Sequence, residues 1–300
     1  MALLFLVLLD DNPLHLKGEF LCPSRKIEID SNLSMIILTD TESFSVMLPE
    51  RLNECELLVL LKWQELKEQQ GLTTGQFAFE WLKICLSEEA FLLLVTACEP
   101  DKVAEWSVDC SAIFLAQNEG LTEQKLPVLS LRGLRLIGQK SRCPSIKFGQ
   151  WVEADEQFLL WYKSKNDKHL AKLAAILYRK DRETEYDSSN NAEIAHRILH
   201  EVERPILLLI AEFWAGCRAL FEARFKRVFP KLLEAETIKP KELKYADIQQ
   251  MVLAYHEKMV QYAKTPDRKM AMYQGNAWTV FEFIEYDLKI YEQMKATTPK

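Results

Sequence analysis

Two histidines, His196 and His200, stand four residues apart in a segment whose pattern predicts a helix over residues 190–202. Residues at this spacing lie on one side of a helix, which is the arrangement that two imidazoles need to bind one metal ion. Glu193 or Glu203 could add an oxygen ligand. The apolar residues of the segment point roughly opposite to the histidines, however, and a catalytic metal needs a third ligand in an enclosed cavity. We therefore predict a solvated face without a metal, and a metal site at this histidine pair is the weaker alternative.

A second group with chemical potential is the basic cluster of residues 163–182, where seven Lys or Arg side chains stand against two Asp. Such a cluster could contact nucleic-acid phosphates, and the candidates for that role are Lys165, Lys168, Lys172 and Arg179. The same residues carry the apolar stripe of a core helix, and lysines commonly cover the outer side of such a helix. Nucleic-acid binding is therefore the less favoured interpretation.

Other signatures of catalysis are missing from the sequence. The nine glycines form neither a dinucleotide fingerprint nor a phosphate-binding loop, and the chain has no G-x-S-x-G or H-E-x-x-H pattern. Acidic pairs such as Glu153 with Asp155 have no histidine nearby in sequence, so we expect them to be charged surface. We expect no cofactor, and we predict that the chain is not an enzyme.

Composition limits the class of protein further. The 300 residues are 48% hydrophobic and 27% charged, with a formal net charge of −6, which gives no overall attraction for nucleic acid or an anionic membrane. The seven cysteines include no C-x-x-C pair and are odd in number, which is typical of free thiols in a reducing compartment. No stretch reaches the roughly 20 apolar residues that span a bilayer.

Hydrophobic periodicity predicts a mainly α protein, a helical bundle with a small N-terminal β-containing segment, α+β overall. Residues 1–48 are β-rich, with short strands near 26–29, 35–38 and 44–48. Residues 49–143 are mixed and mostly helical, with helices near 57–66, 74–86 and 90–98 and either a hairpin or two short strands near 126–137. Thr73 or Thr74 can cap the second of these helices, and Gly71 can end the first.

Residues 144–300 are expected to form a helical domain, joined to the preceding part near residues 140–144. A helix pair is predicted over 149–163 and 167–178, with Asp167 as a cap. The helix predicted at 205–229 starts at a proline, is apolar all round at first, and should organise the domain. Further helices are expected over 245–264 and 277–295. The last carries apolar residues that suit either contact with a partner protein or closure of the protein's own bundle: Trp278, Phe281, Phe283, Ile284 and Tyr286. Of these, Trp278, Phe281 and Tyr286 are the predicted contact residues.

Two segments of this half also carry a recognisable pattern. Residues 146–155 read IKFGQWVEAD and residues 170–179 read LAKLAAILYR. The combination of F-G-Q-[WY]-x-x-A-[DE] with L-x-x-L-x-A-x-L-Y-R resembles a group of uncharacterised bacteriophage and prophage proteins. The group is also similar around residues 47–55, 213–217 and 228–229, so that the resemblance covers about two thirds of the chain. Its motifs are structural and not catalytic.

The resemblance implies a place in the tail module of a phage genome. Helical proteins of that module act as assembly chaperones or as virion components. The resemblance therefore implies a protein that works through contacts with other tail-module proteins or with itself, in the cytoplasm of a bacterial host or in the virion. The alternative from a different class is a metal-dependent or nucleic-acid-modifying enzyme that uses His196 and His200.

Overall fold

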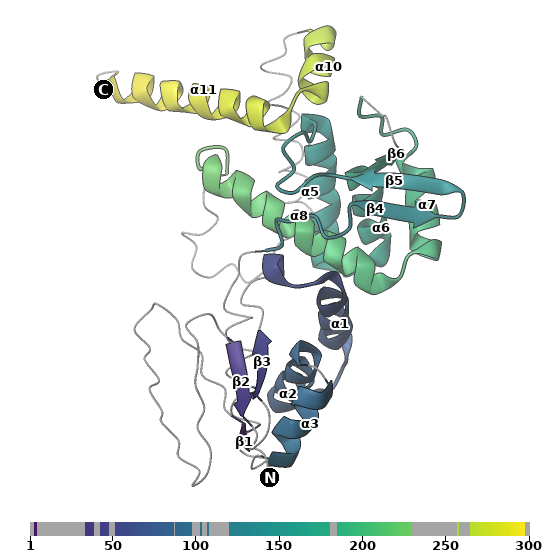
Figure 1. Ribbon diagram of the computed structural model, residues 1–300. Helices are drawn as coiled ribbons and strands as arrows, with labels where there is room; N and C mark the ends of the chain where they lie inside the picture. Colours follow the sequence, from purple (N-terminus) through teal and green to yellow (C-terminus); the bar gives the residue numbers. More distant parts are fainter. Residues whose placement is uncertain are drawn as a thin grey trace. The chain divides into compact units, whose positions relative to one another are not determined.

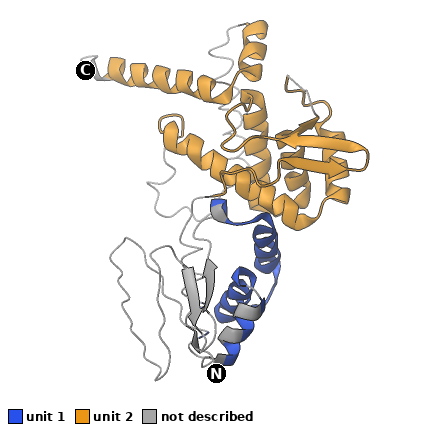
Figure 2. Ribbon diagram, in the orientation of Figure 1, with its two compact units in different colours: residues 1–119 blue, residues 120–300 orange. Residues whose placement is uncertain are grey.

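The computed structural model describes residues 3–4, 34–38, 43–47, 52–86, 88–97, 103, 107, 120–180, 185–229, 257 and 265–297. The chain forms two compact units, Met1–Glu119 and Gly120–Lys300 (Figure 2). Helices dominate, and each unit contains a small three-stranded antiparallel sheet (Figure 1), which confirms the predicted mainly α, α+β class. None of the described helices is both long enough and apolar enough to cross a membrane.

The first unit contains the N-terminal sheet, in the order β1 (Leu3–Leu4), β2 (Ser34–Leu38) and β3 (Ser43–Met47). Met35 pairs with Val46 and Ile37 with Phe44 along the hairpin of β2 and β3. These strands lie where alternation of apolar residues predicts them. The strand expected at 26–29 lies outside the described residues.

Three helices follow in the same unit: α1 (Leu57–Glu68), α2 (Thr74–Cys85) and α3 (Glu88–Ala97), preceded by the 3-10 turn η1 (Leu52–Glu54). Gly71 has φ of 84°, which suits the left-handed turn after α1. Thr73 caps α2, because its hydroxyl accepts from Gln76 N while the Gln76 side chain accepts from Thr73 N. Trp63 then packs against Trp81, with ring centroids 4.5 Å apart.

The second unit opens with a hairpin of β4 (Val128–Leu131) and β5 (Leu134–Gly138), as predicted, with Gly133 at φ of 70° in its turn. The strand β6 (Tyr178–Lys180) pairs with β5 and ends the sheet. We expected the helix before it to include Tyr178. The tyrosine instead extends into the sheet, where its hydroxyl donates to the Leu126 carbonyl at 2.7 Å.

The domain boundary expected near residues 140–144 lies inside this second unit. Arg142 N donates to the Thr122 carbonyl at 2.8 Å, and Trp278 Nε1 donates to the Cys143 carbonyl at 3.1 Å. The backbone at Leu121 also lies against α8 at Gly216. A Cβ on Gly216 would be only 2.5 Å from the Leu121 carbonyl oxygen. Residues 120–143 are therefore packed into the helical unit.

The helix pair of the second unit is α5 (Phe148–Ser164) and α6 (Asp167–Leu177), close to the predicted ranges. Lys165 adopts a left-handed conformation, with φ of 54°, in the turn between them. The cap of α6 is Asn166, whose Oδ1 accepts from Lys168 N at 3.0 Å. Asp167, the expected cap, is the first helical residue and binds Arg204 Nε at 2.8 Å instead.

Two further helices are α7 (Asn191–Glu201) and α8 (Arg204–Arg224), with a proline in the first turn of α8 as predicted. The helix α8 was expected to continue to residue 229. It ends at Arg224 instead. The backbone after it is held by Glu285 of α11, whose carboxylate accepts from the N–H groups of Arg227 and Val228 at 2.9 and 3.1 Å. Buried apolar residues cover most of α8, in agreement with its central role.

The chain ends with α10 (Pro266–Gln274), which Thr265 caps, and α11 (Ala277–Thr297), close to the predicted final helix. The helix expected over 245–264 lies outside the described residues, apart from residue 257. Aromatic rings form the core where α5, α8 and α11 meet. Trp151 lies 4.8 Å from Phe281 and 5.6 Å from Phe221 between ring centroids.

Candidate functional site

The helix α11 is attached to the rest of its unit by the first two turns. Phe281 and Ile284 are buried, and Phe281 packs edge-on against Phe148 as well as Trp151. Trp278 stacks on Phe221 at 3.9 Å between ring centroids. Of the three residues predicted for partner contact, Trp278 and Phe281 therefore belong to internal packing, because their rings complete the aromatic core.

A set of ion pairs connects α11, as far along as Glu292, to the residues at and after the end of α8. The Arg227 guanidinium binds Glu285 and Glu292, both at 3.0 Å, and Arg224 lies 3.5 Å from Glu282. The hydrogen bonds from Arg227 to the carboxylates of Glu292 and Glu285 raise the pKa of the guanidinium. The acidic side of α11 is therefore directed at α8, which leaves another side of the helix for other contacts.

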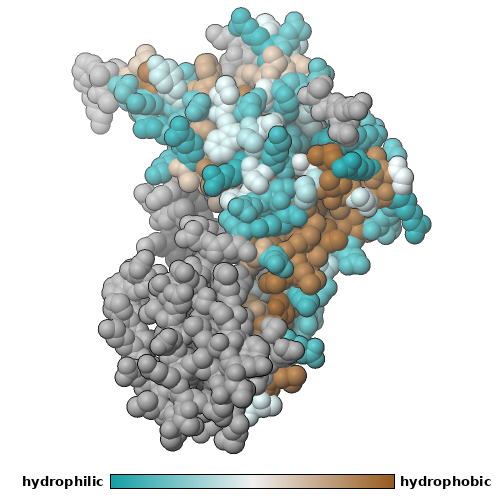
Figure 3. Space-filling model, in the orientation of Figure 1, coloured by the Kyte–Doolittle hydropathy of each residue, from teal (hydrophilic) through white to brown (hydrophobic). Residues whose placement is uncertain are grey.

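That other side carries large apolar and aromatic groups that remain in contact with solvent. Their exposed fractions exceed one half, and the residues are Phe283 (55%), Tyr286 (61%), Tyr291 (65%) and Met294 (64%). We call these four residues the α11 stripe. At about 100° per residue they fall within an arc of roughly 140° on the helix, and Tyr291 at one edge of this arc lies about 20° from the direction of the buried Ile284, seven residues beyond this last buried residue of α11. Apolar atoms interrupt the hydrophilic surface near the C-terminal end of α11 in Figure 3.

Phe283 and Tyr286 of this stripe belong to the apolar set that the sequence predicted to suit partner contact, whereas Tyr291 and Met294 were not predicted. The signal for the two missed residues was the helical spacing, because Tyr291 and Met294 follow Phe283 by eight and eleven positions. Single exposed apolar residues are common on proteins, whereas several large ones on one helical face are typical of interaction surfaces.

The basic cluster is divided between structural and solvent-exposed side chains. Arg179 donates to Asn191 Oδ1 at 2.5 Å and to the Asp187 carbonyl at 2.6 Å. The Lys165 ammonium lies 4.6 Å from the ring centroid of Trp161 and 4.4 Å from that of Tyr162. Lys168 and Lys172 are exposed on α6. The structure therefore uses Arg179 within the fold and leaves Lys165, Lys168 and Lys172 exposed, with Lys165 lying over two aromatic rings.

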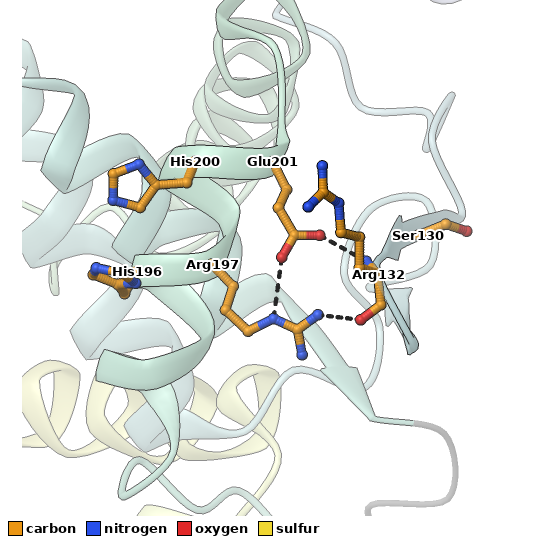
Figure 4. A pocket seen from close by; sticks show the side chains of 6 residues that line it. All are labelled: Ser130, Arg132, His196, Arg197, His200 and Glu201. Carbon is orange, nitrogen blue, oxygen red and sulfur yellow. Dashed lines mark hydrogen bonds and ion pairs between the residues drawn. The ribbon is translucent and has the colours of Figure 1, made fainter.

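His196 and His200 are exposed on α7, with ring centroids 4.6 Å apart. They line a surface depression of about 590 Å³ together with Ser130, Arg132, Arg197 and Glu201 (Figure 4). In Figure 4 both imidazoles turn away from the Glu201 carboxylate. Within the described ranges, no group of three or more His, Cys, Asp or Glu side chains is placed to hold a metal ion.

The polar contacts of this depression attach the hairpin to α7. Glu201 accepts from Arg132 N at 2.6 Å and from Arg197 Nε at 3.2 Å, and Arg197 Nη2 donates to the Arg132 carbonyl at 2.5 Å. The backbone hydrogen bond from Arg132 and the charge of Arg197 lower the pKa of Glu201. The carboxylate of this depression therefore stabilises the turn of the hairpin.

Asp155 was expected at the surface and is instead 1% exposed, on the buried side of α5. Its Oδ1 accepts from Arg218 Nε at 2.5 Å, while its Oδ2 has no hydrogen-bond partner. Arg218 also binds Glu222 one turn further along α8. Burial raises the pKa of Asp155, although the charge and the hydrogen bond of Arg218 lower it. Glu222 likewise has a raised pKa, chiefly through burial.

Glu153, the other member of this acidic pair, joins a network that the sequence did not reveal. Its carboxylate accepts from Tyr186 Oη at 2.6 Å, from Asn191 Nδ2 at 3.3 Å and from the hydroxyl of Tyr273. Burial, reinforced by the neighbouring Glu153, raises the pKa of both tyrosines, so that they remain donors. Three donors from three parts of the chain thus use Glu153 to connect α5, α7 and α10.

The network is closed by two further features. The Gln274 side chain makes two hydrogen bonds to the backbone of Tyr186. Its Oε1 accepts from Tyr186 N at 2.8 Å, and its Nε2 donates to the Tyr186 carbonyl at 2.7 Å. The ring of Tyr273 lies so close to Gly149 that a Cβ there would be 2.3 Å from it. The glycine of the F-G-Q-W segment is therefore required by the packing of α10 on α5.

These observations identify the α11 stripe as the best candidate for a functional surface in the described part of the chain. The polar clusters around Glu153, Asp155 and Glu201 make hydrogen bonds that connect elements of the second unit to one another, and they therefore have structural roles. No protein-family model matches this chain, and no curated protein and no solved structure matches it.

Proposed function

We propose that this protein acts through protein–protein contacts in the assembly or the structure of a phage-type tail, and that the α11 stripe is its contact surface. The observation that carries the proposal is the exposure of Phe283, Tyr286, Tyr291 and Met294 along a helix whose first turns pack against α5 and whose acidic residues bind Arg227 after the end of α8. Burial of large aromatic side chains is the main source of affinity in protein interfaces.

The positions of the sequence pattern support this proposal. Phe148, Gly149, Gln150, Trp151 and Asp155 of the IKFGQWVEAD segment are all buried. The LAKLAAILYR segment is buried at nearly every position except Lys172 and Arg179. The residues that carry the resemblance to phage tail-module proteins therefore build the core of the second unit, as expected for motifs that maintain a fold.

An enzyme that uses His196 and His200 remains the alternative, but no specific observation favours it. A catalytic metal would need at least one more ligand and an enclosed cavity. The imidazoles lie instead on the exposed side of α7, beside a carboxylate whose contacts are to Arg132 and Arg197.

The experiment is co-purification from cells that express the complete tail module, with a tag on this chain. We expect another tail protein to be retained by the natural chain and lost from the variant Tyr286→Asp/Tyr291→Asp, because two charges in the stripe cannot be buried in a contact. Met270 on α10 is 60% exposed, so Met270→Asp is a matched control that should retain the partner.

Circular dichroism would establish that both variants are folded. Failure of the natural chain to retain any tail protein would contradict the proposal, and so would retention by the double variant.

A further inference from the structure

Aromatic side chains gather at the C-terminal end of α5, beside the turn that leads to α6. Phe158, Trp161 and Tyr162 have ring centroids 5.9 to 6.4 Å apart. Their spacing of three and four positions places them on one side of the helix. Phe158 and Trp161 are half-buried, and Tyr162 is 40% exposed. The end of α5 therefore presents part of an aromatic surface to solvent.

Lysines follow these rings along the turn and α6. Residues 158–172 contain four lysines and a single acidic residue, Asp167, whose carboxylate binds Arg204 Nε at 2.8 Å. Lys165, Lys168 and Lys172 are exposed, and the last two lie one turn apart on the same side of α6. This surface is therefore positive, although the chain has a net charge of −6. We call the following residues the α5–α6 patch: Phe158, Trp161, Tyr162, Lys165, Lys168 and Lys172.

The turn between α5 and α6 places Lys165 over the rings. Its backbone has φ of 54°, in the left-handed region that residues with a Cβ seldom adopt, and its N–H donates to the Trp161 carbonyl at 2.7 Å. The Lys165 ammonium lies 4.6 Å from the ring centroid of Trp161 and 4.4 Å from that of Tyr162. A cation is held only weakly over an exposed ring, so this ammonium can turn to a phosphate and leave the ring faces to a flat group.

We propose that the α5–α6 patch binds short stretches of single-stranded nucleic acid, with Lys165, Lys168 and Lys172 at the phosphates and a base stacked on Tyr162. Exposed aromatic rings beside basic side chains are the combination that sequence-tolerant binding of single strands uses, since every base has a flat face. A duplex hides these faces inside its stack, and an acidic peptide lacks them. The aromatic half of the patch therefore favours a single strand over both.

The small number of cations determines the expected affinity. Three phosphate contacts on a single strand predict that the logarithm of the binding constant falls with the logarithm of the salt concentration with a slope of about −2, since each contact contributes about −0.7. Stacking adds affinity that is not ionic. We expect a Kd below roughly 100 μM at low salt and weaker binding at physiological salt.

The test titrates a fluorescein-labelled oligothymidine of about 15 nucleotides with the full-length protein and follows fluorescence anisotropy at several salt concentrations. We expect saturable binding, and weaker binding of a duplex of the same length and of poly-glutamate. Ultraviolet irradiation of the complex should cross-link thymine to a peptide that contains Trp161 or Tyr162, which mass spectrometry identifies. The cross-link is formed by the natural chain, so it does not depend on the folding of any variant.

Three substitutions separate stacking from charge. Tyr162→Ala should lower the affinity at least about fivefold, whereas Tyr162→Phe should retain it, because phenylalanine keeps the ring. Lys165→Gly should make the salt slope shallower by about 0.7. Glycine adopts the left-handed φ of this position more readily than lysine, so that this variant keeps its turn. Lys269→Ala, at an exposed lysine of α10, is the matched control and should bind as the natural chain does.

The inference would be overturned by the absence of saturable binding or by equal affinity of Tyr162→Ala and the natural chain. Tighter binding of poly-glutamate than of the oligonucleotide would also overturn it and would identify a site for acidic proteins. The variant Tyr286→Asp/Tyr291→Asp should bind the oligonucleotide unchanged, which keeps this test separate from that of the α11 stripe. Loss of binding in that variant would place the nucleic acid at α11 and contradict the inference.

Discussion

Asp155 is a residue whose environment in the structure differs from the one that its sequence predicts. Its sequence position beside Glu153 suggests a charged surface, yet it lies on the buried side of α5 with Arg218 on one oxygen and no partner on the other. The cost of burying the charge exceeds the attraction of the guanidinium, so that the pKa of the carboxyl is raised. Replacement of this residue should therefore change how stability depends on pH.

The predicted sign follows from proton binding. Because the folded protein has the higher pKa, it holds the Asp155 proton more tightly than the unfolded chain does. The stability that this carboxyl contributes is greatest below its unfolded pKa of about 3.9, and it falls as pH rises through the folded pKa. We expect the free energy of unfolding of the natural chain, minus that of Asp155→Asn, to decrease as the pH is raised from about 4.

Urea denaturation of both proteins across this range measures the difference. A difference that increased with pH would mean that Arg218 lowers the pKa below its unfolded value, and would contradict this description of the buried pair.

The histidine pair yields a second prediction at the scale of residues. His196 and His200 are exposed, and no third ligand lies beside them among the described residues. We expect calorimetric titration with Zn²⁺ to show no saturable site at micromolar concentrations of metal. A stoichiometric site that disappears in His196→Ala would contradict the assignment of a solvated face and would restore the metal-enzyme alternative.

Glu285 determines the placement of α11 at the scale of elements. It accepts two backbone N–H groups beyond the end of α8 and binds Arg227, and its side chain is only 19% exposed. Hydrogen bonds to a charged group contribute about 1.5–3 kcal/mol, whereas an exposed ion pair contributes about 1 kcal/mol or less. Loss of Glu285 should therefore loosen α11.

We expect Glu285→Gln to accelerate amide hydrogen exchange in α11 by about tenfold or more, since 1.4 kcal/mol corresponds to a factor of ten. Glu282→Gln is the matched control, because Glu282 is 61% exposed and lies 3.5 Å from an exposed arginine. Equal exchange in the two variants would show that Glu285 does not hold the helix.

Most elements were predictable because local signals determine them. The cap of α2 at Thr73, the glycine Gly71 after α1 and the proline at the start of α8 all agree with the structure. The end of α8 and the strand β6 were not predictable, since each depends on a distant partner. Glu285 captures the chain beyond α8, and β5 pairs with the residues after Leu177.

The candidate surface was only partly predictable for the same reason. Tyr286 was expected to contact a partner, and it is exposed. Trp278 and Phe281 looked equivalent to it in the sequence, but Phe281 is buried against Trp151 of α5, and the half-buried Trp278 stacks on Phe221 of α8. The predicted boundary near residues 140–144 also differs from the observed one after residue 119. Contacts with distant positions, such as the hydrogen bond from Trp278 to the Cys143 carbonyl, hold residues 120–143 in the second unit.

At the scale of the whole molecule, most of the polar clusters are used to hold the second unit together. Glu153 connects α5, α7 and α10, Glu201 connects the hairpin to α7, and Arg218 connects α8 to α5. In contrast, each of the four side chains of the α11 stripe is more than half exposed. We infer from this distribution that the molecule acts by docking with other chains.

The most direct measurement places a photoreactive benzoylphenylalanine at position 286 in cells that carry the whole tail module. We predict a covalent adduct between position 286 and another tail protein or a second copy of this chain, identified by mass spectrometry. The same amino acid at position 270 should give no such adduct. The account would be contradicted if position 286 gave no protein adduct while the chain was folded and present at its normal level.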